Sequence, residues 1–252
     1  MELHVRKEIN LLFTSAGRRV ELLRAFRRAY EVLGIGGSIV ITDIDPLAPT
    51  IQVADRVYLV PRLNQSEYIP TLIEICKREQ IHAIFPLIDP DVPVLARHRA
   101  QIETTGARLG VIPESAVETV NDKWATAQFF QRIGVPTPRS WLPAQIDPAT
   151  ADYPLFIKPR GGSAAKHTFK VRDARELAFF KDYVPEPIIQ EYLPGAEITN
   201  DVTVDLDGKV LAVVSRQRIE VRSGEVAKGV TIYDAAIADA CKRIAEALPA
   251  IA

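Results

Sequence analysis

Short apolar runs alternate with amphipathic stretches in the first third of the chain. Residues 10–14 and 38–42 are continuous apolar runs of strand length, and 57–60 and 81–87 are further short runs. Between these runs, apolar residues recur at helical spacing, and Gly34 follows the first such stretch. Alternation of strands and helices predicts an α/β domain with a doubly wound parallel sheet.

Three polar turns follow the predicted strands, at residues 14–19, 43–45 and 89–91. In a parallel sheet, ligands bind at the carboxyl ends of the strands, where such turns lie. A dinucleotide fingerprint needs three glycines at fixed spacing, whereas the first turn has only Gly17, so a nicotinamide enzyme stays an alternative. The aspartates of the other two turns suit substrate contact and ordinary turn chemistry equally well.

The pattern changes in the second half of the chain. An Asn-Asp pair suited to an N-cap precedes a stretch of helical spacing that Gly134 closes. The proline-rich passage 135–143 is expected to be extended, and short strands follow, with Asp207 and Gly208 as a tight hairpin turn. The shift predicts a boundary near residue 115, with a doubly wound α/β domain over 1–114 and an α+β domain over 115–252.

The clearest candidate chemistry lies in residues 153–166. A short apolar run ends in Lys158, and a loop of small residues with two further cations follows directly. A strand fixes a cation at its tip, while a glycine-rich turn lets backbone N–H groups approach phosphate oxygens. Further along, a strand edge carries Glu191 and Glu197, which could contact a base and ribose hydroxyls. Together these features predict a nucleoside triphosphate site.

The order of the 121–123 segment, the Lys158 strand, the small-residue loop and the 190–197 segment resembles that of ATP-grasp enzymes. Residues 14–19 and 86–89 resemble the Rossmann-like pre-ATP-grasp domain, and the whole chain looks most similar to the large subunit of carbamoyl phosphate synthase. The resemblance implies ATP as the ligand. The implied contacts are Lys123 and Lys158 for the phosphates, Gly161, Gly162, Ser163 and Lys166 for the covering loop, and Gln190, Glu191 (adenine amino group), Leu193 (backbone contact to the ring) and Glu197 (ribose) for the nucleoside.

Two departures from the family pattern concern the loop and the metal. Ala164, Ala165 and His167 stand where smaller residues or glycines are expected, which predicts a stiffer loop. The resemblance also implies Mg²⁺ held by a Glu-x-Asn segment near the end of the domain, but Asn200 is the last asparagine. We therefore expect no metal ligands in this chain, an ATP-grasp domain incomplete at its C-terminus, and Mg²⁺ ligands beyond Ala252.

Alternation along residues 216–222 places Arg216, Arg218, Glu220 and Arg222 on one face of a predicted strand. An exposed sheet face explains this pattern. A site in which Arg216, Arg218 and Arg222 hold an acyl phosphate or a carboxylate explains it equally well, because arginine binds oxyanions in a bidentate manner. We predict these three arginines as catalytic residues.

Composition limits the classes of binding partner and the cellular compartment that we expect for this protein. The 252 residues are 47% hydrophobic and 25% charged, with a net charge of −1, which gives no electrostatic reason to expect nucleic acid. No apolar run approaches the about 20 residues that span a bilayer. The two cysteines lie far apart, so a cytoplasmic protein without a disulfide framework is expected.

These observations predict an ATP-dependent ligase that activates a carboxylate as an acyl phosphate. An amine or thiol would then attack, releasing ADP and phosphate. The alternative, from another class, is a nucleotide-binding regulatory or scaffold module without full catalysis. Small molecules are the expected partners, and a homodimer stays open as the assembly.

Overall fold

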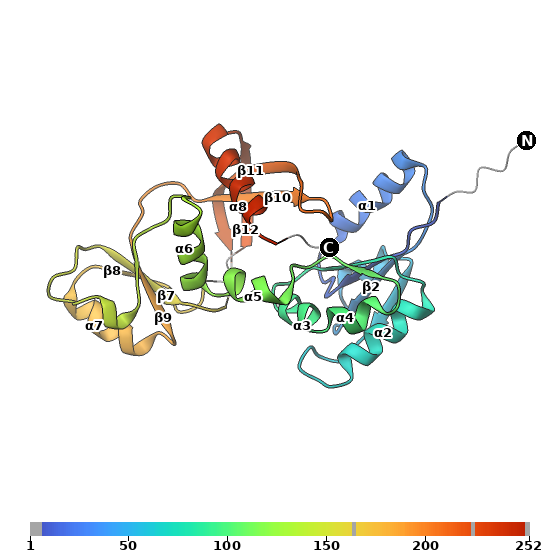
Figure 1. The fold of residues 1–252 in the computed structure, drawn as a ribbon, viewed down its shortest axis with the longest axis horizontal. Coiled ribbons are helices and arrows are strands. Elements are labelled where there is room, and N and C mark those ends of the chain that lie inside the picture. The colour runs from blue at the N-terminus through green and yellow to red at the C-terminus, as the bar shows by residue number, and fades with distance from the viewer. Residues whose placement is uncertain (1–6, 163–164, 223–224, 250–252) are drawn as a thin grey trace, which may run out of the picture. The chain divides into compact units, whose positions relative to one another are not determined.

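The computed structural model describes residues 7–162, 165–222 and 225–249. Contacts divide the chain into two compact units, unit 1 up to Val117 and unit 2 over Glu118–Pro249. The division falls inside helix α5 (Glu114–Asn121), a few residues beyond the boundary that the sequence pattern predicts. Figure 1 colours unit 1 from blue to green and unit 2 from green to red.

Unit 1 contains a sheet of five parallel strands in the order β3-β2-β1-β4-β5. The four apolar runs of the sequence all become strands of this sheet, and residues 10–14 and 38–42 supply its entirely buried strands β1 and β2. This architecture confirms the predicted α/β class. The strands are β1 (Leu11–Thr14), β2 (Ile39–Asp43), β3 (Arg56–Leu59), β4 (Ala83–Pro86) and β5 (Arg108–Leu109).

Helices connect the strands of unit 1, as the alternating pattern predicts. The first of them ends at Gly34, whose φ of 64° is in the left-handed region that glycine adopts without a steric penalty. The connecting segments are α1 (Val20–Leu33), the 3₁₀ turn η1 (Pro49–Gln52), α2 (Tyr68–Arg78), α3 (Asp91–Arg97) and α4 (Arg99–Glu103).

Hydrophobic clusters cover both faces of this sheet. Phe13 packs with Leu23 on the α1 side, whereas its neighbour Leu12 packs with Leu72 on the α2 side. Successive residues of a strand point to opposite faces, so a continuous apolar run is what a sheet covered on both sides requires. Each such buried side chain stabilises the fold by about 1.5–3 kcal/mol.

Unit 2 begins with helix α6 (Lys123–Arg132) and an antiparallel sheet of four strands in the order β6-β9-β7-β8. Helix α7 (Ala174–Tyr183) places Leu177 against Leu155 and Ile157 of β7, which forms the core of this part. The strands are β6 (Ser140–Trp141), β7 (Leu155–Pro159), β8 (Phe169–Val171) and β9 (Pro187–Glu191), with the 3₁₀ turn η2 (Pro143–Gln145) after β6.

A second antiparallel sheet completes unit 2, with strands β10 (Ile198–Val204), β11 (Val210–Arg222) and β12 (Glu225–Ile232). Gly208 has a φ of 84° between β10 and β11, which confirms the predicted turn. Helix α8 (Ala235–Ala247) packs against β10 and β11. Across the described ranges, every helix is too short or too polar to cross a bilayer.

Candidate nucleotide-binding site

Strand β7 fixes the position of Lys158. Ile157 is fully buried beneath the sheet, so the alternation of the strand turns Lys158 and Phe156 to the opposite face. The Lys158 Nζ atom lies 5.5 Å from the centre of the Phe156 ring. The apolar run that flanks this lysine in the sequence therefore holds its cation at a defined place at the end of an interior strand.

Lys123 is the first residue of α6 and contacts the loop that follows β7. Its Nζ atom donates hydrogen bonds to the carbonyl oxygens of Arg160 (3.2 Å), Gly161 (3.3 Å) and Gly162 (2.9 Å). Its backbone N–H also donates to the Arg160 carbonyl, at 3.0 Å. The structure thus brings Lys123 to the predicted phosphate loop, although the two segments are far apart in sequence.

A cleft of about 680 Å³ lies between this loop and strand β11. Four cations line it, and Glu197 is the sole carboxylate among its described lining residues. The cleft is therefore suited to a polyanion. Its lining consists of Lys123, Phe156, Lys158, Pro159, Gly161, Gly162, Ala165, Lys166, His167, Thr168, Glu197, Arg218 and Val221.

The two lysines carry perturbed pKa values. Burial lowers the pKa of Lys158 below the ordinary lysine value, the charge of Lys123 lowers it further, and Glu197 opposes both effects. Burial also lowers the pKa of Lys123, against the opposing charge of Asp122. Both ammonium groups are therefore under-compensated in the ligand-free protein, and anionic oxygens in the cleft would stabilise their charged forms.

The residues predicted to contact the nucleoside are only in part at the cleft. Glu197 lines it, whereas Gln190, Glu191 and Leu193 are outside its lining as the described residues define it. The Glu191 carboxylate accepts hydrogen bonds from the backbone and the Nε atom of Arg139, both at 2.9 Å, and these contacts lower its pKa. Gln190 is buried and donates to the Ser140 hydroxyl at 2.8 Å.

Irregular pairing of strand β11 interrupts the single face on which the sequence places Arg216, Arg218 and Arg222. Strand β11 has register shifts between Arg218 and Val221, so both of these residues line the cleft although strict alternation would separate them. Arg218 pairs with Glu197 at 2.5 Å, while Arg216 pairs with Asp201 at 2.8 Å outside the cleft lining. The side chain of Arg222 lies outside the described residues, as does Ser163 of the loop.

The bulge in β11 had one signal in the sequence. Gly229 of β12 pairs with Arg218, and a Cβ atom at this glycine would stand 3.0 Å from the Gln217 carbonyl oxygen. A glycine inside a strand often marks a bulge or a close backbone approach. Sequence alternation alone misses this feature because it depends on the register of the partner strand.

Arg160, the other cation of the predicted loop, does not line the cleft. Its guanidinium forms an ion pair with Asp122 at 2.6 Å, and this contact raises the pKa of Arg160. The sequence identifies Asp122 as a helix cap but gives no sign of this partner, because the two residues meet only in the folded chain.

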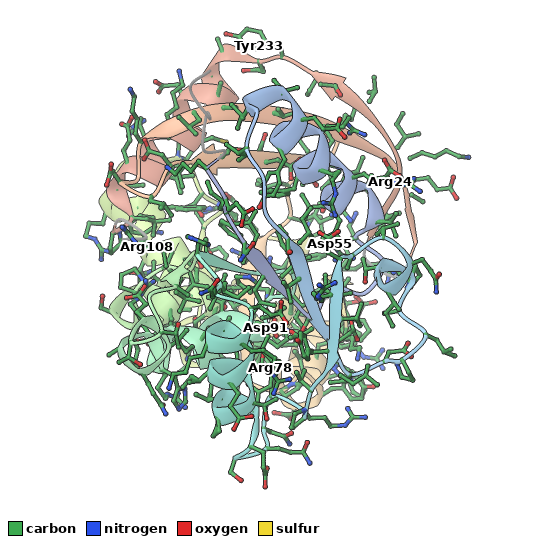
Figure 2. The ribbon with its side chains drawn as sticks, turned by 90° about the vertical axis from the view of Figure 1, so that its right-hand side faces the viewer. Arg24, Asp55, Arg78, Asp91, Arg108 and Tyr233 are labelled. Atoms are coloured by element: carbon green, nitrogen blue, oxygen red, sulfur yellow. The ribbon has the colours of Figure 1, made fainter. Side chains whose placement is uncertain are left out.

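The polar turns of unit 1 form hydrogen bonds with one another. Asp91, labelled in Figure 2, is completely buried and accepts hydrogen bonds from Thr14 (2.5 Å) and Ser15 (3.0 Å). Asp43 accepts from the backbone N–H groups of Gly17 (2.7 Å) and Asp45 (2.9 Å). Only the contact of Asp43 with Asp45 is the local turn chemistry that the sequence allowed, whereas Asp91 joins the turn after β1 to the turn after β4.

Metal ligands are not gathered anywhere in the part of the chain that the structure describes. Within residues 7–162, 165–222 and 225–249, no group of three His, Cys, Asp or Glu side chains has an arrangement that could hold a metal ion. The residues at the cleft therefore do not by themselves fit a Mg²⁺ site, since this ion requires several oxygen ligands.

The fold and the cleft define a class of protein that comparison with known families also identifies. Residues 120–252 match the ATP-grasp domain, and residues 11–110 match the PylC-like N-terminal domain. The first match spans more than half of the chain, and the protein belongs to the ATP-grasp family. The family resemblance that the sequence motifs suggested is thereby confirmed.

Relatives of known activity are ligases and synthases. The carbamoyl-phosphate synthase of Methanobrevibacter smithii is 28% identical over 182 residues, which are 69% of this chain and 47% of that protein. The 3-methyl-D-ornithine–L-lysine ligase of Methanosarcina barkeri is 24% identical over 199 residues, which are 79% of this chain and 49% of that protein. The chain spans about half the length of these relatives.

Solved structures share the fold. The N5-carboxyaminoimidazole synthetase of Staphylococcus aureus, complexed with ADP, aligns with a TM-score of 0.70 at 13% identity, over 96% of this chain and 63% of that one. The L-amino acid ligase of Bacillus licheniformis aligns with a TM-score of 0.68 at 17% identity, over 96% and 60%. Both alignments cover the mixed architecture of parallel and antiparallel sheets described above.

Proposed function

We propose that this protein is an ATP-dependent ligase that activates a carboxylate as an acyl phosphate for attack by an amine or a thiol. The observation that carries the proposal is the cationic cleft, in which Lys123 and Lys158 flank the loop with Gly161 and Gly162. The ligase names of the curated relatives support the reaction class. ADP and phosphate are the expected by-products.

The contribution of the described residues is electrostatic and positional. A nucleoside triphosphate brings several negative charges into a cleft where four cations face one carboxylate. Donors that are fixed before the ligand arrives stabilise the charge that develops on a transferring phosphoryl group without reorganisation. Lys123 and Lys158 would hold phosphate oxygens, Lys166 would close over them, and Glu197 would accept ribose hydroxyls.

Arg218 is the arginine of β11 that the cleft geometry favours for the acyl phosphate or the carboxylate. It lines the cleft, whereas Arg216 pairs with Asp201 elsewhere. It also contacts Glu197, the proposed ribose carboxylate, at 2.5 Å. Arginine suits this task because its planar fork matches two oxyanion oxygens at once.

Mg²⁺ belongs to the proposal as the usual companion of ATP. The described residues supply no cluster of metal ligands, so its protein ligands would come from outside them, and no step above depends on it. The substrates proposed are small molecules, and the assembly proposed is a homodimer. The free thiols of Cys76 and Cys241 support a reducing compartment, which we propose to be the cytoplasm.

Thermal unfolding of the full chain with ADP or a non-hydrolysable ATP analogue, with and without Mg²⁺, tests the nucleotide site. Ligand at a hundred times its Kd adds about 2.7 kcal/mol to the free energy of unfolding, which raises Tm by roughly 5–10 °C for a chain of this size. Lys158→Ala should remove at least half of the shift. The matched control Lys242→Ala, on the exposed side of α8, should retain it.

Turnover by the full-length protein tests the reaction. With ATP and a panel of carboxylic acids, hydroxylamine should trap an acyl phosphate as a hydroxamate while ADP is released. Product formation without ATP would overturn the proposed ligase. Nucleotide binding without ADP release across the panel would favour a nucleotide-binding module instead.

A further inference from the structure

Asp122 and Lys123 at the start of α6 both contact Arg160 in the loop after β7. The side chain of Asp122 contacts that of Arg160 at 2.6 Å, and the backbone N–H of Lys123 donates to the Arg160 carbonyl at 3.0 Å. The backbone N–H of Arg160 in turn donates to the Glu186 carbonyl at 3.0 Å. Arg160 is therefore fixed through its side chain, its N–H and its carbonyl group.

Asp122 uses its two carboxylate oxygens for different partners. Oδ1 accepts hydrogen bonds from the backbone N–H groups of Trp124 (2.8 Å) and Ala125 (3.0 Å), which caps the helix. Oδ2 accepts from the guanidinium of Arg160. The capping function requires one side-chain oxygen, whereas the link to the loop requires the second oxygen and the negative charge.

Lys123 contacts the same segment of the loop. Its ammonium group directs hydrogen bonds to three successive loop carbonyls, beginning with that of Arg160. An ammonium group has three donors, so in the ligand-free protein each can be directed to a loop carbonyl, and a bound phosphate oxygen would replace one of these acceptors. A displacement of Arg160 would move these carbonyls and the proposed phosphate ligand Lys123 together.

We propose that Asp122 is a positioning residue that acts through Arg160 to hold Lys123 and the phosphate loop in the geometry that receives the triphosphate. This inference rests on the proposed nucleotide site and adds to it a residue that touches no ligand. The Asp122 side chain is 21% exposed, so solvent screens its charge only in part.

A purely electrostatic effect of the Asp122 charge would change ATP affinity in the direction opposite to that expected from positioning. Asp122 places a negative charge beside Lys123, so Asp122→Asn would strengthen ATP binding if only long-range electrostatics mattered. Asparagine is also as good a helix cap as aspartate, so this variant keeps the contacts to Trp124 and Ala125. The variant removes the ion pair with Arg160 and leaves the helix start intact.

Isothermal titration of the full chain with ATP, together with a thermal melt, tests the proposal. We expect Asp122→Asn to weaken ATP binding by about three- to tenfold, as loss of a partly buried charged hydrogen bond implies, while the ligand-free Tm stays within about 2 °C because the cap remains. Arg160→Gln should weaken ATP binding to a similar extent. The double variant should bind ATP no more weakly than the single variant with the lower affinity, because both substitutions remove the same contact.

Asp173→Asn is the matched control. Asp173 caps α7 in the same way, accepting from Arg175 and Glu176 at 2.9 Å each, and it is outside the cleft lining. Its substitution should leave ATP affinity unchanged. Unchanged or tighter ATP binding by Asp122→Asn, or additive losses in the double variant, would overturn the positioning proposal alone. A wild-type chain that fails to bind ATP would overturn the proposed function as well.

Discussion

Lys158 illustrates a conflict between stability and binding at a single residue. Its ammonium group is partly buried and close to Lys123, and both effects lower its pKa, so its charge destabilises the ligand-free fold. The same charge is what a phosphate group requires. A residue that costs stability without a ligand and is positioned by a rigid strand is typical of a functional site.

Lys158→Met separates these two effects, because methionine keeps much of the apolar stem and removes the charge. We expect the free energy of unfolding of the ligand-free protein to rise by roughly 0.5–1 kcal/mol, after allowance for solvent screening. ATP binding should weaken by about ten- to hundredfold through the loss of a charged hydrogen bond. Urea unfolding and titration calorimetry would measure both; lower stability with intact affinity would contradict the assignment.

ATP affinity should depend on pH through Lys158 and Lys123. Because their pKa values are lowered, both lysines lose their protons at a pH below the ordinary lysine pKa of about 10.4. ATP affinity should therefore fall as the pH rises from the lowered pKa values towards the ordinary one. In the same window the unfolded chain binds more protons than the ligand-free fold, so the free energy of unfolding rises with pH. Titrations between about pH 7 and 10 would show both trends.

The sequence predicts the two lysines and the loop residues of the site, but it does not predict the partners of Glu191 and Glu197. Lys158 ends an apolar run and Lys123 begins a helix, and local pattern determines both features. The pairs Glu191–Arg139 and Glu197–Arg218 join segments that only the fold brings together. Their existence depends on tertiary geometry, which local spacing does not encode.

Strand β7 shows how an element supports a site at the next scale. Ile157 is fully buried among Leu155, Leu177 and Ile189, and the residue after it is the candidate phosphate ligand. Packing beneath the sheet therefore fixes the direction of the cation above it. Apolar run and turn signals were sufficient to predict this strand, because both its burial and its end are local in sequence.

Ile157→Ala should destabilise unit 2 by about 2–4 kcal/mol, the sum of lost burial and a residual cavity. ATP affinity should fall together with stability, because the strand that carries Lys158 loses its support. Chemical unfolding followed by Trp124 and Trp141 fluorescence measures the first effect. Phe179→Ala, whose side chain is 61% exposed, is the control and should cost less than about 1 kcal/mol.

Strand β11 shows the limit of pattern at the same scale. Strict alternation would set Arg218 and Val221 on opposite faces, but the register shifts against β12 bring both to the cleft. A bulge is a property of two strands and their pairing, so one strand's sequence does not determine it. Gly229 on the partner strand is a local indication of the bulge.

The whole chain consists of two units with separate hydrophobic cores. The clusters around Leu12 and Phe13 belong to unit 1, and the cluster around Ile157 belongs to unit 2. The described residues of the proposed nucleotide site all lie in unit 2. Ligand binding should therefore stabilise the two units unequally.

The two cysteines allow each unit to be followed separately, since Cys76 belongs to unit 1, Cys241 belongs to unit 2, and both thiols are buried. Burial raises the pKa of both thiols, that of Cys76 to about 12, so each reacts only when its surroundings open. With saturating ADP, we expect thiol labelling near the Tm to slow at least about tenfold at Cys241 and little at Cys76.

Mass spectrometry of the labelled peptides would measure the two rates in one sample, and Lys158→Met should reduce the protection of Cys241. Equal protection of both thiols would show that the units unfold as one cooperative body, in which the binding free energy is shared. Protection of Cys76 alone would contradict the placement of the nucleotide in unit 2. Slower labelling at Cys241 alone would show that nucleotide binding at the cationic cleft stabilises the unit that contains the cleft and its lysines.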